Sequence, residues 1–198
     1  MNITVFASHG GSDLQAIING CKSGNINAKV CAVISNNSDS MALERAKAES
    51  IDHYHLSQKV IDSQQELDSK ILEILDIHNT DMIFLAGYLK KLGVDILKKY
   101  ENRVFNIHPA LLPKYGGKGM YGMNVHNAVI QAKEKTSGVT IHRVDEEYDS
   151  GEIVAQTTVH VVDDDTPEIL AARILKCEHT FLIEVINDII MGKIRLGK

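Results

Sequence analysis

The sequence predicts an α/β fold: a doubly wound, mainly parallel sheet of about seven strands, with helices on both faces. Three observations favour this class. Short apolar runs rich in β-forming residues alternate with segments whose apolar residues recur at helical spacing. Two alternating strands stand close together near the C-terminus and predict an antiparallel hairpin. No repeat, low-complexity tract or linker divides the 198 residues, which suit one compact domain.

The first half of the chain alternates strands and helices. ITVFA (3–7) and AKVCAVIS (28–35) are apolar runs typical of buried strands, and LQAIINGC (14–21) between them has helical spacing. A polar turn precedes a helix at 41–49, and DHYHLS (52–57) is a shorter third strand. The segment 61–78 is an amphipathic helix. DMIFLAG (81–87) and RVFNIH (103–108) are the fourth and fifth strands, separated by a helix at 94–99.

The second half of the chain begins with a stretch rich in proline and glycine. Residues 109–124 hold two of the three prolines and four glycines, and a loop of this length is a candidate for function. A helix is expected at 125–133, followed by strands at 138–144 and 151–161. Thr166 is the expected N-cap of the last helix, with Pro167 at its first position and its end at about Ile190.

Composition narrows the class of protein. The net charge is −5 without a basic run, and Trp is absent, so neither a nucleic-acid groove nor a base-stacking platform is expected. The three cysteines form no C-x-x-C pair, which favours a reducing compartment. No signal peptide, membrane span or zinc spacing of His and Cys is visible. These features predict a soluble cytoplasmic protein with no nucleic-acid, membrane or metal partner.

The turn SHGGSDLQ (8–15) is the first candidate site. Gly10 and Gly11 remove side chains where the backbone must turn, and free N–H groups at the following helix start favour an anion. The alternative is that Ser12 and Gln15 form a capping box and nothing more. The two interpretations are compatible, because a capped helix still has spare donors.

Asn106 and His108, two residues apart at the end of the fifth strand, form the second candidate site. Residues two apart on a strand share a face and lie roughly 6–7 Å apart along the backbone, while Phe105 and Ile107 pack on the other side. Ligands of open α/β sheets bind at the carboxyl ends of parallel strands. An amide and an imidazole there offer an oxyanion donor and a proton-transfer group. The alternative is a structural pair satisfied by local backbone.

The loop DEEYDSGE (145–152) holds five carboxylates. Such a cluster is ordinarily a solvated turn, and DSG is ordinary turn chemistry. The functional alternative needs one carboxylate directed inward to meet a histidine and favour its charged form. The spacing does not choose which carboxylate this is.

Taken in order, these motifs resemble the phosphoribosylglycinamide formyltransferase family over nearly the whole chain. The resemblance rests on GGSDLQAII from residue 10, MIFLAGYLKKL from 82, FNIHPALLPKY from 105, SGVTIHRVDEEYDSGEIVAQ from 137, and EH at 178–179. It implies an enzyme of purine biosynthesis. Such an enzyme transfers a formyl group from its co-substrate, 10-formyltetrahydrofolate, to the amine of glycinamide ribonucleotide.

The resemblance assigns the catalytic roles. Asn106 would donate to the oxyanion that forms when the amine attacks the formyl carbon. His108 would stabilise the intermediate and move protons, so that N10 of the folate leaves protonated. Asp149 would pair with His108 and raise its pKa, because an imidazolium can both donate to the oxyanion and shuttle its proton.

The resemblance also assigns binding residues. The substrate's phosphate is expected on the backbone of Gly11, Ser12 and Asp13, where aspartate departs from the usual asparagine and should turn its carboxylate away. Glu178 corresponds to a glutamate that contacts the ribose, and His142 to a histidine near the site whose role could equally be structural. The folate is expected against a set of residues from two segments and the fifth strand: Leu89, Lys90, Lys91, Leu92, Asn106, Val144, Asp145 and Asp149.

Three features depart from the family pattern or extend it. The Lys90–Lys91 pair and Gln64 stand where arginines are frequent, so the grip on the folate tail is undefined. The glycine-rich segment Gly116–Val125 is longer than the usual form and predicts a mobile lid.

Residues 1–100 are expected to form a phosphate-binding half and 101–198 a catalytic and folate-binding half of one domain, in a monomer or homodimer.

Other functions stay open at this point. A formyltetrahydrofolate hydrolase would carry an N-terminal regulatory domain and a methionyl-tRNA formyltransferase a basic C-terminal domain, and the length of this chain disfavours both. A non-catalytic folate- or nucleotide-binding module would lack Asn106, His108 or Asp149, and all three are present.

Overall fold

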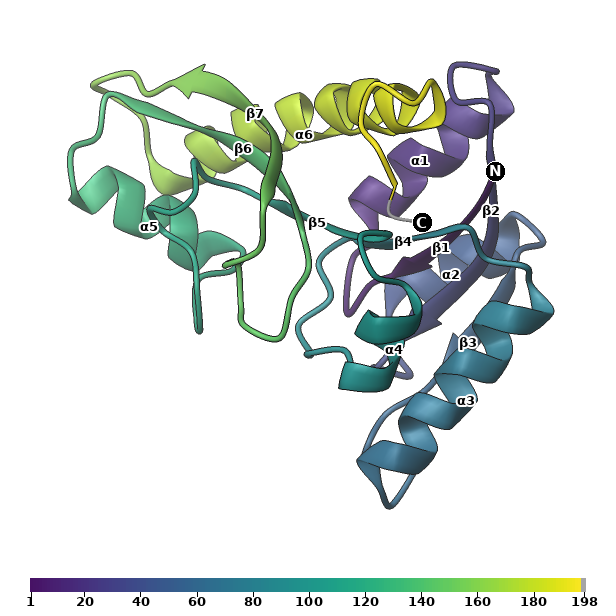
Figure 1. The fold of residues 1–198 in the computed structure, drawn as a ribbon. Coiled ribbons are helices and arrows are strands. Elements are labelled where there is room, and N and C mark those ends of the chain that lie inside the picture. Colours follow the sequence, from purple (N-terminus) through teal and green to yellow (C-terminus); the bar gives the residue numbers. More distant parts are fainter. Residues whose placement is uncertain (197–198) are drawn as a thin grey trace.

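The computed structural model describes residues 1–196, which contain one sheet of seven strands (Figure 1). The strands are β1 (Asn2–Phe6), β2 (Lys29–Ser35), β3 (Asp52–His55), β4 (Met82–Leu85), β5 (Val104–His108), β6 (Thr136–Arg143) and β7 (Ile153–His160). Their order in the sheet is β3-β2-β1-β4-β5-β6-β7. The first five are mutually parallel, whereas β6 runs antiparallel to both of its neighbours, β5 and β7. The predicted mainly parallel sheet with a C-terminal hairpin is confirmed.

Helices cover both faces of this sheet. They are α1 (Ser12–Lys22), α2 (Met41–Ala48), α3 (Gln64–Ile77), α4 (Val94–Lys99), α5 (Met123–Gln131) and α6 (Pro167–Ile190). The helices α1 and α6 pack against each other on one face and share a core with α2 and α5 (Figure 1). A second core joins α3 and α4 to the opposite face. The doubly wound architecture predicted from the sequence is therefore confirmed.

The side chains of the central strands alternate between the two cores. In β1, Val5 belongs to the α1–α6 core and Phe6 to the α3–α4 core. In β5, Phe105 and Ile107 pack in the α1–α6 core, as the period of two predicts. A slip of one residue would move each of these side chains to the wrong face, and burying one large apolar side chain is worth about 1.5–3 kcal/mol. This packing fixes the register that turns Asn106 and His108 toward the other face.

The helix ends confirm some local predictions and correct others. Thr166 caps α6, since its hydroxyl accepts from the Ile169 N–H at 3.3 Å, and Pro167 is the first helical residue. The interpretation of Ser12 and Gln15 as a capping box is wrong. The N-cap of α1 is Gly11 without a side-chain cap, and the Gln15 side-chain oxygen accepts instead from Arg45 at 3.1 Å.

Two helices begin elsewhere than expected. The helix α3 begins at Gln64 rather than at residue 61, because the Ser63 hydroxyl accepts from the Glu66 N–H at 3.1 Å and caps it there. The helix α5 begins at Met123, two residues before the expected start. Within residues 1–196, no helix combines the length and the apolar character needed to span a bilayer. The last two residues of the expected 101–198 half lie outside the described part of the chain.

Candidate active site

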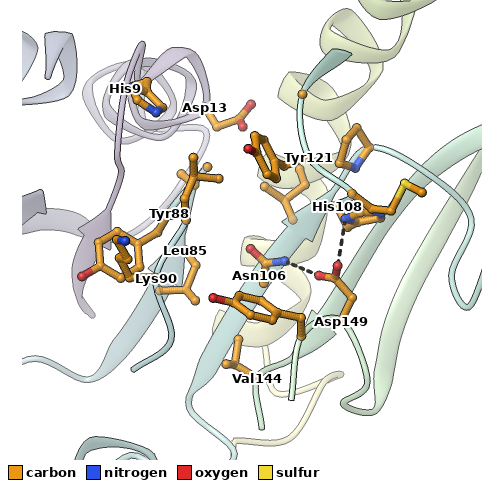
Figure 2. A pocket seen from close by; sticks show the side chains of 18 of the residues that line it. His9, Asp13, Leu85, Tyr88, Lys90, Asn106, His108, Tyr121, Val144 and Asp149 are labelled. Carbon is orange, nitrogen blue, oxygen red and sulfur yellow. Dashed lines mark hydrogen bonds and ion pairs between the residues drawn. The ribbon is translucent and has the colours of Figure 1, made fainter. Parts of the chain in front are cut away.

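A cavity of about 600 Å³ opens at the carboxyl ends of β1, β4 and β5. These strands are parallel neighbours, so the segments that follow them meet at one edge of the sheet. The loop between β6 and β7, the segment 117–123 and part of α6 complete the wall. Figure 2 shows His9 and Asp13 on one side of this cavity and His108 and Asp149 on the other. Every catalytic, substrate-binding or folate-binding residue expected from the sequence lines it.

The turn between β1 and α1 exposes backbone donors to the cavity. Gly11 has a φ of +66°, and a Cβ there would lie 2.9 Å from the Cβ of Ala42, so this position requires glycine. The side chain of Arg45 holds the turn by donating from Nε to the Gly10 carbonyl at 2.8 Å. Because α1 has no side-chain cap, the N–H groups of its first turn are available to an anionic ligand.

Two carboxyl groups lie beside that turn, of which Glu178 is buried and Asp13 is nearly so. Asp13 directs Oδ1 toward α6, where His179 Nε2 is 3.6 Å away, and among residues 1–196 this oxygen has no hydrogen-bond partner. Burial raises the pKa of Asp13, although the charge of His179 partly opposes the rise. Burial also raises the pKa of Glu178, and the nearby Asp13 charge adds to this effect. The pair therefore favours a protonated Glu178, which can donate as well as accept a hydrogen bond.

His108 is held between a backbone carbonyl and a carboxylate. Its Nε2 donates to the Tyr115 carbonyl at 2.7 Å, and its Nδ1 lies 3.6 Å from Asp149 Oδ2. Burial lowers the pKa of His108, and the opposing influences of Asp149 and of the Tyr115 carbonyl do not overcome it. Asp149 acts in the expected direction, but desolvation of the imidazolium outweighs it.

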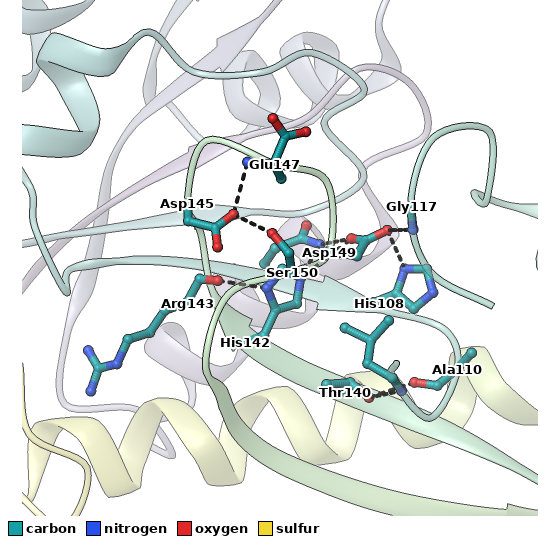
Figure 3. A network of polar contacts seen from close by, with 12 residues as sticks. His108, Ala110, Gly117, Thr140, His142, Arg143, Asp145, Glu147, Asp149 and Ser150 are labelled. Atoms are coloured by element: carbon teal, nitrogen blue, oxygen red, sulfur yellow. Dashed lines mark hydrogen bonds and ion pairs between the residues drawn. The ribbon is translucent and has the colours of Figure 1, made fainter. Parts of the chain in front are cut away.

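Asp149 is the carboxylate that points inward from the loop between β6 and β7 (Figure 3). Its Oδ2 accepts from the Gly117 N–H at 2.8 Å, and its Oδ1 lies 3.5 Å from His142 Nε2. Burial alone would raise the pKa of Asp149, but the contacts with His142, His108 and Gly117 hold it below its ordinary value. Asp145, in contrast, accepts from the Ser150 hydroxyl within the loop itself. The loop thus contains an inward-pointing carboxylate that favours its ionised form, Asp149, and a carboxylate that stabilises the turn, Asp145.

Asn106 lies next to this carboxylate (Figure 2). Its Nδ2 is 3.0 Å from His142 Nε2 and 3.4 Å from Asp149 Oδ1. Both amide N–H groups therefore face protein acceptors, whereas the role of oxyanion donor requires one that faces the cavity.

The backbone around the site is fixed by close contacts. The Thr140 hydroxyl donates to the Ala110 carbonyl at 2.6 Å and accepts from the Leu112 N–H at 3.1 Å, which ties the segment after His108 to β6 (Figure 3). In the neighbouring loop, a Cβ at Gly151 would lie 2.0 Å from the Arg143 carbonyl oxygen. The DSG sequence therefore needs its glycine for a close backbone approach.

Some contributors to the site escaped the sequence analysis. The Tyr115 carbonyl and the Gly117 N–H are backbone groups, which carry no signal in the sequence. His126 on α5 is 5% exposed and lines the cavity, and its Nδ1 is buried without a partner among the described residues. Only its polar character on an otherwise apolar helix face could have marked it. Within residues 1–196, no three His, Cys, Asp or Glu side chains are grouped as metal ligands would be.

A second cavity of about 620 Å³ adjoins the first and shares Lys90 and Tyr88 with it. Gln64 lines this second cavity, where its amide donates to Asp68 and accepts from Gln58, each at 2.6 Å. Lys91 is paired with Glu147 at 3.0 Å. Lys90 and Lys91 thus line both cavities, whereas Gln64 lines the second.

Comparison with known proteins gives a consistent result. A family model described as formyl transferase matches residues 1–186. A phosphoribosylglycinamide formyltransferase of Escherichia coli K12 is 34% identical over 196 residues, which cover 99% of this chain and 90% of the relative. The chloroplastic phosphoribosylglycinamide formyltransferase of Arabidopsis thaliana is 40% identical, and the match covers 98% of this chain but only 66% of that relative. The chain thus spans slightly less than two thirds of the plant protein.

Among solved structures, the crystal structure of glycinamide ribonucleotide transformylase 1 from Symbiobacterium toebii is similar throughout. The TM-score is 0.89 at 34% identity, and the match covers 97% of this chain and 88% of the other. The similarity therefore extends over nearly the whole chain.

Proposed function

The chain belongs to the formyl transferase family, and we propose that it transfers a formyl group from 10-formyltetrahydrofolate to the amine of glycinamide ribonucleotide. The products are formylglycinamide ribonucleotide and tetrahydrofolate, in the biosynthesis of purines. The observation that carries this proposal is the convergence of Asn106, His108 and Asp149 at the strand ends, in one cavity with an uncapped helix N-terminus.

The two ends of the cavity suit the two substrates. The N–H groups of Gly11, Ser12 and Asp13 begin α1, where backbone donors and the helix dipole favour a phosphate. Glu178 lies close by and, when protonated, can donate to a ribose hydroxyl as well as accept from one. We assign the pterin to the other end, against Leu89–Leu92 and the loop from Val144 to Asp149, which line the same cavity.

The reaction needs charge stabilisation and two proton movements. The amine nitrogen attacks the formyl carbon, and the π electrons of the C=O bond move to its oxygen. The amine then loses a proton and N10 of the folate gains one, and the oxyanion re-forms the C=O bond as the C–N10 bond breaks with its electron pair on N10. We assign the proton movements to His108, and a single well-placed donor such as the Asn106 amide is worth about 2.7–4 kcal/mol to the transition state. Asp149 favours the charged imidazole of His108 throughout.

Other expectations accompany this proposal. Glycinamide ribonucleotide and the folate are the small-molecule partners, with no metal, nucleic acid or membrane, and the protein acts as a monomer or homodimer. We expect it in the cytoplasm, although the Arabidopsis relative is named as chloroplastic. Size-exclusion chromatography with light scattering measures the oligomeric state directly.

A steady-state assay of folate product tests the proposal. We expect turnover of 10-formyltetrahydrofolate only when glycinamide ribonucleotide is present, and a loss of about 10²–10⁴-fold in kcat for His108→Ala. His160→Ala, which removes an exposed histidine from β7, is the matched control and should leave kcat unchanged. Folate release without the acceptor would indicate a hydrolase instead. Binding of both ligands without any turnover would indicate a binding module.

A further inference from the structure

We infer that His142 is a positioning residue that determines which end of the Asn106 amide faces the cavity. The inference rests on the proposed function, because only a developing oxyanion requires an N–H group at that point. His142 lies on β6 directly opposite Asn106 on β5, and it is 2% exposed. Little water can therefore reach His142 to replace Asn106 as its hydrogen-bond partner.

One nitrogen of His142 has a fixed role. Its Nδ1 lies 2.7 Å from the carbonyl oxygen of Arg143 (Figure 3). A carbonyl oxygen only accepts, so Nδ1 must carry a proton in every state that keeps this bond. In the neutral imidazole, Nε2 is then left with a lone pair and no proton.

The unprotonated Nε2 of His142 determines the orientation of the Asn106 amide. His142 Nε2 and Asn106 Nδ2 are 3.0 Å apart, so a neutral His142 accepts from the amide N–H. The second N–H of the same amide faces Asp149 Oδ1 at 3.4 Å. Both donors are then occupied, and the amide oxygen is the only group that Asn106 can present to the cavity. An amide oxygen would repel a developing oxyanion.

A second proton on His142 reverses this arrangement. Nε2 then becomes a donor, and the best partner that Asn106 can offer is its amide oxygen. A half-turn of the amide about its last side-chain bond exchanges oxygen and nitrogen with almost no change in shape, because the two ends are nearly isosteric. The amide nitrogen then faces the cavity and can donate to the oxyanion. His142 makes and breaks no bond to the substrate and keeps its proton during the attack.

The carboxylate of Asp149 faces Nε2 of His142. The charged or titratable groups that the structure places against His142 are Asp149, from the loop between β6 and β7, and His108 on β5. Asn106 and the β7 partner Ile153 are uncharged. The carboxylate lies 3.5 Å from His142 Nε2 and 3.6 Å from His108 Nδ1.

The two imidazoles are arranged alike around this carboxylate. Each has its outer nitrogen bonded to a backbone carbonyl, Tyr115 for His108 and Arg143 for His142, and each turns its inner nitrogen toward Asp149. A charge on His142 lowers the pKa of His108, so the two inner protons compete for one carboxylate. The orientation of Asn106 is therefore coupled to the proton that His108 uses.

A double-mutant cycle separates positioning from a structural role. We expect Asn106→Ala to lower kcat by about 10²–10³-fold, as for other oxyanion donors, and His142→Phe to lower it by at least about tenfold. If His142 acts through Asn106, His142→Phe in the Asn106→Ala background should cause no further loss, within about twofold. His142→Gln should recover most of the wild-type kcat, because glutamine can offer Asn106 a donor without a change in protonation. Independent losses that multiply, or a glutamine variant as impaired as the phenylalanine one, would overturn the inference.

Nitrogen NMR of the protein labelled at histidine provides a readout that needs no turnover. In neutral His142 we expect a protonated Nδ1 and an unprotonated Nε2. On acidification, the signals of Nε2 and of the Asn106 side-chain amide should change together, and this joint change should be absent in His142→Gln. The inference would be overturned if neutral His142 carried its proton on Nε2. It would also be overturned if the Asn106 amide signal stayed unchanged while the His142 Nε2 signal changed. Failure of the proposed function would instead appear as a wild type without acceptor-dependent turnover, whatever the NMR shows.

Discussion

At the scale of single residues, the pKa of His108 depends on its burial and on the charge of Asp149. Burial lowers the pKa of His108 and the Asp149 charge raises it, so removing the charge leaves burial unopposed. We expect Asp149→Asn to lower the pKa of His108 further. If the imidazolium is the active form, the fall in kcat with rising pH should begin at a lower pH, and the maximal kcat should drop by about 10²-fold. A pH profile of kcat measures both effects.

Asp145→Asn is the matched control for this change. Asp145 belongs to the same loop, but it accepts from the Ser150 hydroxyl and the Glu147 N–H rather than facing a histidine. Its variant should keep the wild-type pH profile. An Asp149→Asn profile that also coincides with the wild type would show that the carboxylate does not act on His108.

The sequence predicted these residues to different degrees. Asn106 and His108 follow from the period of two, because apolar Phe105 and Ile107 before and between them fix which face each side chain takes. Asp149 could be chosen among five loop carboxylates only through the family resemblance. A backbone φ of +55° directs its side chain inward, and the spacing of residues in the sequence does not reveal this turn geometry. The net change in the pKa of His108 depends on how deeply it is buried, which is a tertiary property.

At the scale of elements, α1 and α6 meet around the carboxyl groups of Asp13 and Glu178. Burial raises both pKa values, so the folded protein holds protons that the unfolded chain releases above the ordinary carboxyl range. The free energy of unfolding should therefore fall as pH rises from about 4.5 through the raised pKa values, by up to about 1.4 kcal/mol per pH unit for each carboxyl group. Glu178→Gln should remove most of this fall and be at least about 1 kcal/mol more stable than the wild type at pH 8. Urea unfolding across this pH range measures it.

Glu184→Gln on the exposed side of α6 serves as the control, and it should leave the pH dependence unchanged. Should Glu178→Gln show the same fall in stability as the wild type, burial of that carboxyl would not be the cause.

The segment Gly116–Val125 remains predicted to be a mobile lid. Its Gly117 N–H donates to Asp149, so this segment touches the carboxylate that we propose to be catalytic, and Tyr121 is exposed and lines the cavity. We expect limited proteolysis to cut within this segment first, and saturating folate and ribonucleotide to slow the cut at least about fivefold, since a closed state binds both. An exposed site outside the lid should be cut at the same rate with and without ligand. Equal cleavage of the lid in both conditions would contradict the prediction.

Element boundaries were less predictable than element types. Ser63 and Glu66 carried a capping signal that places the start of α3 correctly, but the apolar Ile61 drew the prediction three residues too early. At α1 the same kind of signal, Ser12 and Gln15, misled, because Gly11 adopts a left-handed conformation and Arg45 takes the glutamine side chain. A local pattern cannot report a partner 30 residues away.

At the scale of the whole molecule, the fold class follows from the alternation of apolar strands and amphipathic helices. The order of the strands does not, because each pattern from β1 to β4 would fit several places in a parallel sheet. The chain runs outward from β1 to β3 and then returns to place β4 beside β1. That return brings the turn after β1 next to the ends of β4 and β5, so the segments proposed to bind the phosphate and to carry out the reaction share one cavity. The arrangement that the proposed reaction needs is therefore a property of the topology.

The measurement that tests the proposed reaction most directly follows the formyl carbon itself. The protein is incubated with glycinamide ribonucleotide and 10-formyltetrahydrofolate carrying carbon-13 in the formyl group, and the products are identified by NMR and mass spectrometry. We predict that the label appears on the amine nitrogen of the ribonucleotide in equal amount to the tetrahydrofolate released. Label recovered as formate, with the ribonucleotide unchanged, would contradict the account.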